Sequence, residues 1–247
     1  MVISRANVKE TALPCSTTTH HTATLPTDTA NKKNGATAMY FFLLLSIPAA
    51  ICCLISTDSE YSPKQLSAPI FVGFFTGILT SAFIEFFINS DIYFAGSFIA
   101  IVLSMSAKTI FPPILLTAFF FIFSKDDIEY KAYSTLPLIG AFYSIFIPYL
   151  TMTQGESNSF FMTFTNPVLF IETTIVFSSA VIYGAKEFTD GNRKKLAKPA
   201  ALGLAALMIQ PVMFTLWYLK TASIIAYVLA FALIPTAIFV YKFSRKR

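Results

Sequence analysis

The sequence contains few charged residues for its length. Only 13% of its 247 residues are Asp, Glu, Lys or Arg, whereas 55% are hydrophobic and the mean hydropathy is +0.65. A soluble domain carries about 25% charged residues. Lipid must therefore solvate most of the chain, and the net charge of +5 does not indicate nucleic-acid binding.

The residue sets that most enzymes and cofactor proteins use are also missing. Both histidines, His20 and His21, precede the first long apolar segment, so no such segment supplies a haem ligand or a histidine-assisted nucleophile. Cys15, Cys52 and Cys53 form neither a disulfide framework nor a zinc-binding spacing. The sequence has no Gly-rich phosphate loop. We therefore expect no enzymatic activity, no metal and no cofactor.

Long apolar runs dominate what remains. A bilayer-spanning helix needs about 20 predominantly apolar residues. The fold class that this pattern predicts is all-α, a polytopic transmembrane helix bundle of about eight spans. The predicted spans cover 39–56, 68–88, 92–107, 109–124, 132–152, 160–185, 199–219 and 221–241.

The rest of the chain lies at the two ends of the transmembrane domain 39–241. Residues 1–38 are rich in Thr and poor in apolar side chains, so we expect a disordered tail. Residues 242–247 form a short basic C-terminus.

The distribution of Lys and Arg predicts the topology. With eight spans, fifteen of the 18 Lys and Arg residues lie on the side of the two termini, and only Lys64, Lys108 and Lys220 lie on the other side. Cytoplasmic loops of membrane proteins are enriched in Lys and Arg. We therefore expect both termini to be cytoplasmic, and the protein to be integral to the plasma (inner) membrane.

The region 92–124 allows two topologies. Its two apolar segments have only about fifteen residues each, which is short for a span. Pro112 and Pro113 remove backbone donors and disfavour helix before them. Either two short helices cross the bilayer and turn at Lys108, or 92–124 is a re-entrant hairpin beside six full spans. Both versions return the chain to the cytoplasm.

Small residues at four-residue spacing predict close helix packing. Residues four apart share one helix face, and small side chains let two backbones approach closely in lipid. We expect the two stripes of small residues to face each other, and the charges that end them, Glu85 and Lys108, to lie too far apart to pair. The stripes consist of Gly73, Gly77 and Ser81, and of Gly96, Ala100 and Ser104.

An ionisable residue lies in the middle of the sixth predicted span. Glu172 is thirteen residues from Ala185, roughly 20 Å along a helix. A charged side chain at the bilayer centre costs about 2.5–3.5 kcal/mol on insertion scales. Glu172 must therefore face the bundle interior, pair with another group, or stay protonated.

Gln210 in the seventh span is the partner that depth predicts for Glu172. It lies eleven residues beyond Pro199, roughly 16 Å into the bilayer. Pro211, which follows it, cannot donate to the Leu207 carbonyl and so leaves an acceptor free. We predict a substrate-binding or proton-binding site at Glu172 and Gln210.

Two classes of function fit these features. The first is a transporter of a small solute, coupled to protons through Glu172, because transporters build midplane sites from interrupted helices. The second is a non-catalytic membrane scaffold or accessory subunit, in which the same polar groups only join helices. The expected partners are the lipid bilayer, a small molecule or proton, and membrane partner subunits.

Overall fold

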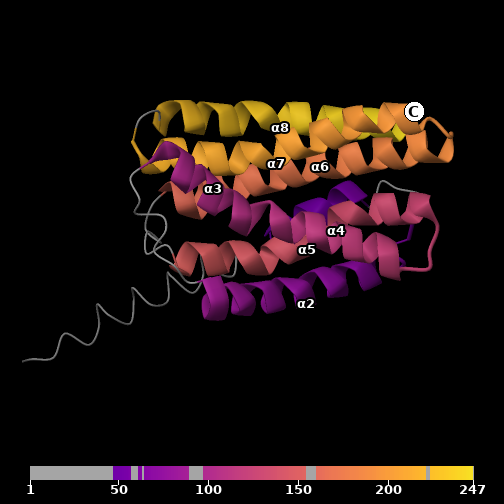
Figure 1. Ribbon diagram of the computed structural model, residues 1–247, viewed down its shortest axis with the longest axis horizontal. Helices are drawn as coiled ribbons and strands as arrows, with labels where there is room; N and C mark the ends of the chain where they lie inside the picture. Colours follow the sequence, from indigo (N-terminus) through magenta and orange to yellow (C-terminus); the bar gives the residue numbers. More distant parts are fainter. Residues whose placement is uncertain are drawn as a thin grey trace, which may run out of the picture. The chain divides into compact units, whose positions relative to one another are not determined.

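The computed structural model describes residues 47–56, 61–62, 64–88, 97–153, 160–220 and 223–246. Every regular element in these ranges is a helix (Figure 1). The tail predicted at 1–38 and Gly96, one of the predicted packing residues, lie outside the described residues.

Six segments of the described chain are long and apolar enough to cross a bilayer, and a shorter apolar helix covers Ile47–Ser56. This arrangement is compatible with a multi-pass membrane protein, but the count of eight spans is not confirmed. The helices are α2 (Ser67–Phe83) with η1 (Ile84–Ile88), α3 (Phe98–Thr109), α4 (Phe111–Phe123), α5 (Ile128–Thr153), η3 (Phe161–Thr165) with α6 (Asn166–Thr189), η4 (Arg193–Leu196), α7 (Ala197–Tyr218) and α8 (Ser223–Lys246).

Contacts between helix termini define two ends of the helical region. At the first, which we call the basic end, the Tyr130 hydroxyl donates to the Gln65 carbonyl at 2.6 Å, and the Lys186 ammonium donates to the Ser244 carbonyl at 3.1 Å. The start of α2, the start of α5 and the ends of α6 and α8 therefore lie together there.

The other termini meet at what we call the opposite end. The Tyr149 hydroxyl donates to the Glu85 carboxylate at 3.1 Å, which joins the last turns of α2 and α5. The Phe161 ring stacks on Trp217 with centroids 4.5 Å apart, and Phe160 lies against Tyr227. Consecutive spans therefore run in alternating directions between the two ends (Figure 1).

The segment Phe98–Phe123 crosses between these ends once, as α3 followed by α4. Ile101 of α3 packs in one cluster with Phe161 at the opposite end, whereas the Phe121 carbonyl near the end of α4 accepts a bond from Lys131 at the basic end. Within residues 97–124, the part of this region that the structure describes, the chain therefore neither turns back at Lys108 nor forms a re-entrant hairpin.

The two prolines change the helix without reversing it. Pro112 and Pro113 stand at the start of α4, where a helix tolerates missing N–H groups. They remove the donors to the carbonyls of Lys108 and Thr109, but Ile110 keeps both its helical hydrogen bonds and its helical backbone angles, so α4 continues in the direction of α3. Sequence reasoning identified the interruption correctly and inferred the wrong change of direction from it.

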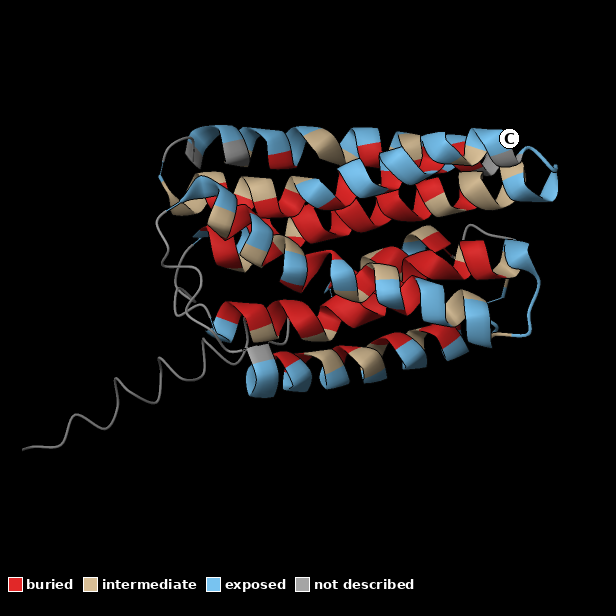
Figure 2. Cartoon of the chain, in the orientation of Figure 1, coloured by how far each residue is buried: buried red, intermediate tan, exposed pale blue. Residues whose placement is uncertain are grey.

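α5 and α6 form the centre of the described structure. Most of their residues are buried, whereas α2 and α8 expose one side along their length (Figure 2). Three hydrophobic clusters connect the central pair to its neighbours. The exposed side of α2 carries Phe71, Phe75, Phe83 and Phe86, which suits contact with lipid acyl chains.

The first stripe of small residues packs against α5, not against α3. Gly73, Gly77 and Ser81 are buried, and a β-carbon built on Gly73 would lie 2.2 Å from the Leu138 carbonyl oxygen. The second stripe is only half-buried at Ala100 and Ser104. α3 instead buries Ile101, Met105 and Lys108. The predicted pairing of the two stripes is therefore wrong, because α5 lies beside α2 in the position expected for α3.

The close approach of α2 to α5 generates a stability prediction. Gly73→Ala should lower the free energy of unfolding by about 1–3 kcal/mol, because the added methyl group overlaps backbone that cannot move aside easily. Gly184→Ala is the matched control, since its β-carbon would lie 3.7 Å from Pro199, an ordinary contact. Unfolding of both variants in detergent measures the difference, and equal stabilities would contradict the packing.

Candidate functional site

Glu172 lies within the described helices, with its carboxyl group cut off from solvent. Its side chain is 4% exposed, and neither carboxyl oxygen has a hydrogen-bond partner among the described residues. Because lipid supplies no hydrogen bonds, an uncompensated carboxylate at this depth is strongly unfavourable. The group must therefore hold a proton, or meet water or a ligand.

The side of α6 that carries Glu172 faces α8. Lys186, fourteen residues after Glu172 and therefore on nearly the same side of the helix, donates to the Ser244 carbonyl of α8. Leu169 and Ile175, one turn before and one turn after Glu172, belong to hydrophobic clusters that also include Ala230 and Ala237. Both alanines belong to α8 and are at most 1% exposed.

Gln210 pairs with Asn166 instead of Glu172. Its amide nitrogen donates to the Asn166 amide oxygen at 2.8 Å, joining α7 to the first residue of α6. Asn166 precedes Glu172 by six residues, about 9 Å along the axis and a third of a turn around it. α6 therefore presents Asn166 to α7 and Glu172 to α8, and the predicted pairing of Glu172 with Gln210 is not found.

The amide pair leaves polar atoms unsatisfied. Thr165 and Asn166 are fully buried and Gln210 is 1% exposed. The Asn166 amide nitrogen, the Gln210 amide oxygen and the Thr165 hydroxyl have no hydrogen-bond partner among the described residues. A buried polar atom without a partner costs about 1–3 kcal/mol, so water or a ligand must complete this cluster.

Irregular backbone surrounds the amide pair on both helices. The π-helical turn η3 ends at Thr165, where the Asn166 N–H donates to the Phe161 carbonyl. On α7, Pro211 lies inside the helix and cannot donate to the Leu207 carbonyl. π-helical turns and proline-interrupted helices recur at binding sites of membrane proteins.

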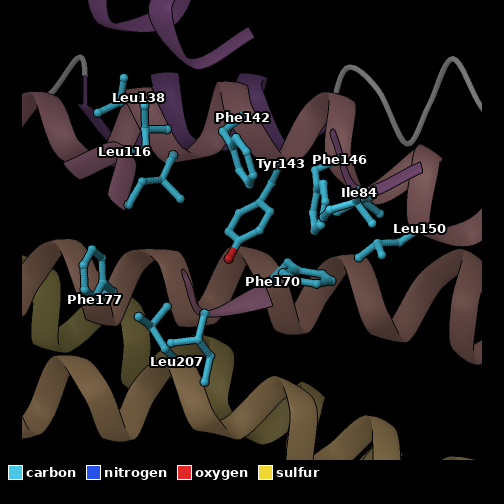
Figure 3. Close-up of a cluster of buried hydrophobic side chains, with 13 residues drawn as sticks. Ile84, Leu116, Leu138, Phe142, Tyr143, Phe146, Leu150, Phe170, Phe177 and Leu207 are labelled. Atoms are coloured by element: carbon cyan, nitrogen blue, oxygen red, sulfur yellow. The ribbon is translucent and has the colours of Figure 1, made fainter. Parts of the chain in front are cut away.

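A second irregular position is the joint between α3 and α4. Pro113 has no N–H, so the Thr109 carbonyl four residues before it loses its helical donor. The Tyr143 hydroxyl of α5 donates to that carbonyl at 3.1 Å. Tyr143 reaches out of a hydrophobic cluster in which its ring lies 4.6 Å from Phe170 (Figure 3). The tyrosine thereby satisfies a backbone group that the sequence leaves open.

Lys108 belongs to the same joint, at mid-span and not at a loop. It is 8% exposed and occupies the last turn of α3, where the helix dipole favours a positive charge. The Glu85 carboxylate lies close enough to interact with it electrostatically. The expectation that these two charges do not pair stays a prediction, although the single crossing of 98–123 places Lys108 at mid-span and not at the end of a span.

Sequence reasoning identified the buried carboxyl group but missed two other polar residues of the helical region, Asn166 and Tyr143. Asn166 was overlooked because it stands before Pro167 in a stretch interpreted only as the start of a span. Tyr143 was overlooked because tyrosines are common in apolar segments. For Tyr143 the available signal was Pro113, which leaves the Thr109 carbonyl open and so predicts a polar partner from another helix.

Comparisons with known proteins yield no match: no protein-family model, no curated protein and no solved structure resembles the chain. Within the described residues, no group of three or more His, Cys, Asp or Glu side chains is placed to hold a metal ion.

The Tyr143 hydrogen bond is testable by a double-mutant cycle. Tyr143→Phe should cost about 0.6–1.5 kcal/mol of stability, because the Thr109 carbonyl loses its donor. Pro113→Ala restores a backbone N–H four residues after Thr109, so in that background Tyr143→Phe should cost much less. The measurement is unfolding in detergent of the two single variants and the double variant. Additive effects would show that the two donors do not serve the same carbonyl.

Proposed function

We propose that the protein is a transporter of a small solute whose movement is coupled to protons through Glu172. The observation that carries the proposal is the unpartnered carboxyl group of Glu172, buried in the helical region. An ionisable residue within the membrane is expensive to insert, and such residues usually mark ion or substrate pathways.

The helix interruptions support the same proposal. Prolines stand inside α5, α7 and α8, and the span Phe98–Phe123 is broken at Ile110. Transporters use such discontinuous helices to place backbone and side-chain polar groups at the midplane and to change shape around them. The break beside Lys108 and the π-helical turn beside Asn166 supply two such positions, next to helices α3 and α6 that both contact α7.

A scaffold or accessory subunit is the alternative function. The Gln210–Asn166 hydrogen bond favours it, because a single interhelical bond between amides is a common way of joining membrane helices. In that case Glu172 would contribute to helix packing alone, and its replacement would leave any transport unchanged.

The proposed orientation places the basic end in the cytoplasm. Short connections at the opposite end contain Lys220 alone, since residues 89–97 and 154–159 have no Lys or Arg. Positive residues mark the cytoplasmic side of short loops. Because Phe98–Phe123 crosses once, the loop with Lys64 joins the C-terminus on that side. The cations at the basic end include Lys64, Lys125, Lys186, Lys194, Lys195, Lys198 and Lys242.

Thiol labelling in intact cells or sealed vesicles tests this orientation. With the three native cysteines replaced by alanine, Ser62→Cys and Asp126→Cys should both react only from the cytoplasmic side. Lys194→Cys, in the loop before α7, is the control for that side. A turn at Lys108 would place Ser62 and Asp126 on different sides, so labelling of the two from different sides would contradict the single crossing.

Glu172→Gln tests the coupling role. The amide has a similar shape and carries no charge, so the variant should insert and unfold at a temperature equal to or above that of the wild type. The solute uptake that depends on an inward proton gradient should fall at least tenfold in this variant, because an amide cannot bind and release a proton. The measurement is uptake of a panel of labelled small solutes into liposomes, with and without the gradient.

Glu85→Gln is the matched control for this experiment. Glu85 is an exposed carboxylate at the end of α2, so its replacement removes a carboxyl group outside the proposed proton site. Its gradient-dependent uptake should stay within about twofold of the wild type. Persistence of the gradient dependence in Glu172→Gln would overturn coupling through Glu172 and favour the scaffold.

A further inference from the structure

We infer that Asn166, Gln210 and Thr165 form the recognition site for the solute, and that they select a neutral group that both donates and accepts hydrogen bonds. Primary carboxamides and urea are the matching chemical class. The inference rests on the proposed transport function for its biological meaning, but its test measures binding alone.

The number of free hydrogen-bonding groups leads to this class. Each of the two amides has an NH₂ group and a carbonyl oxygen, and the bond of 2.8 Å uses one group from each. One amide NH₂ and one amide oxygen remain unsatisfied. Turning both side-chain amides around exchanges their roles but still leaves one donor and one acceptor. A planar amide of the solute would satisfy both at once.

The hydroxyl of Thr165 extends the same site. It is fully buried, has no hydrogen-bond partner among the described residues and directly precedes Asn166 in the chain. Most buried Ser and Thr hydroxyls in the described helices donate to a carbonyl of their own helix, as Thr215 does to Pro211 at 2.7 Å. Thr165 departs from that pattern at the end of a π-helical turn, as Ser134 and Ser178 do elsewhere in the described helices.

The charges at mid-depth explain why the class is neutral. Glu172 lies on the side of α6 that faces α8, and Lys108 interacts with Glu85. The Asn166–Gln210 amide pair itself carries no charge. An ionic solute at the pair would therefore be desolvated without a counter-charge from the pair, at a cost that a neutral amide avoids.

The aromatic surroundings suit a small, flat ligand. Phe161, at the start of η3, stacks on Trp217 and lies beside Phe214 and Tyr227. These rings belong to the cluster that also contains Leu169 and Met162, close in sequence to the amide pair. Apolar and aromatic side chains around a few polar groups are the usual composition of a small-molecule site.

Binding of acetamide to the purified wild-type protein tests the inference. Acetamide should raise the unfolding temperature in detergent with a saturable dependence on concentration, because it binds the folded state. Acetate and ethylammonium, which are similar in size but charged, should produce no saturable shift. If the charged probes match or exceed acetamide, or if none of the three produces a saturable shift, the neutral class is overturned.

Two variants locate the site. Gln210→Met keeps the length of the side chain without hydrogen-bonding groups, and it should weaken acetamide binding about tenfold or more, as expected for hydrogen bonds lost in a buried site. Thr215→Val removes an equally buried hydroxyl from the same helix, whose bond stays within α7, and should bind acetamide like the wild type. Equal affinity in Gln210→Met and the wild type would show that water alone completes the pair.

The comparison of charged and neutral probes needs no variant, so the inference remains testable even if Gln210→Met does not fold. Acetamide binding without uptake in liposomes would support the site and overturn the transport proposal. Gradient-driven uptake of other solutes without acetamide binding would support the transport proposal and overturn the proposed amide site.

Discussion

The constraint on which this structure depends is that lipid offers no hydrogen bonds. Every polar group at membrane depth must find its partner inside the protein. The described helices meet this requirement mainly within themselves. The hydroxyls of Thr135, Ser144, Thr151 and Ser179 each donate to the carbonyl four residues earlier on their own helix. The polar groups that depart from this pattern are therefore informative.

These departures fall into two kinds. At Tyr143 a side chain from α5 supplies the donor that Pro113 removed from the span Phe98–Phe123, so the exception stabilises the fold. At Thr165, Asn166, Gln210 and Glu172, and at the hydroxyls of Ser134 and Ser178, polar atoms remain open although they are buried. A fold that only joined helices would gain by closing or removing such groups. Their retention is the physical basis for placing function at α6.

The central position of α6 gives this argument its geometry. Different sides of α6 contact different neighbours, since Phe177 and Asn166 meet α7 whereas Lys186 meets α8. A proton on Glu172 and a solute at the amide pair would therefore be bound by two sides of one helix that lie about a third of a turn apart. Any movement of α6 against its neighbours would change the surroundings of both, which is the requirement for coupling.

Sequence reasoning determined the class of protein and the helical segments, because hydrophobic runs of sufficient length have no other stable form in a bilayer. It also identified Glu172 as buried, since a carboxyl group that far from either boundary cannot reach water along its own helix. The small residues Gly73, Gly77 and Ser81 were recognised as a packing face from their spacing alone. These inferences need only the residue order within one helix.

The inferences that failed were those that depended on knowing which helices are neighbours. The sequence of 92–124 is compatible with a turn and with a continuous crossing, and packing of α3 on α7 and of α4 on α5 decided for the crossing. The partner of Gln210 was decided by the rotation of α6 about its axis, which hydrophobicity does not specify when a helix is buried on nearly every side. Residue order determined which groups enter the membrane, whereas only tertiary packing decided which of them meet, because neighbours and helix rotation arise from contacts between distant segments.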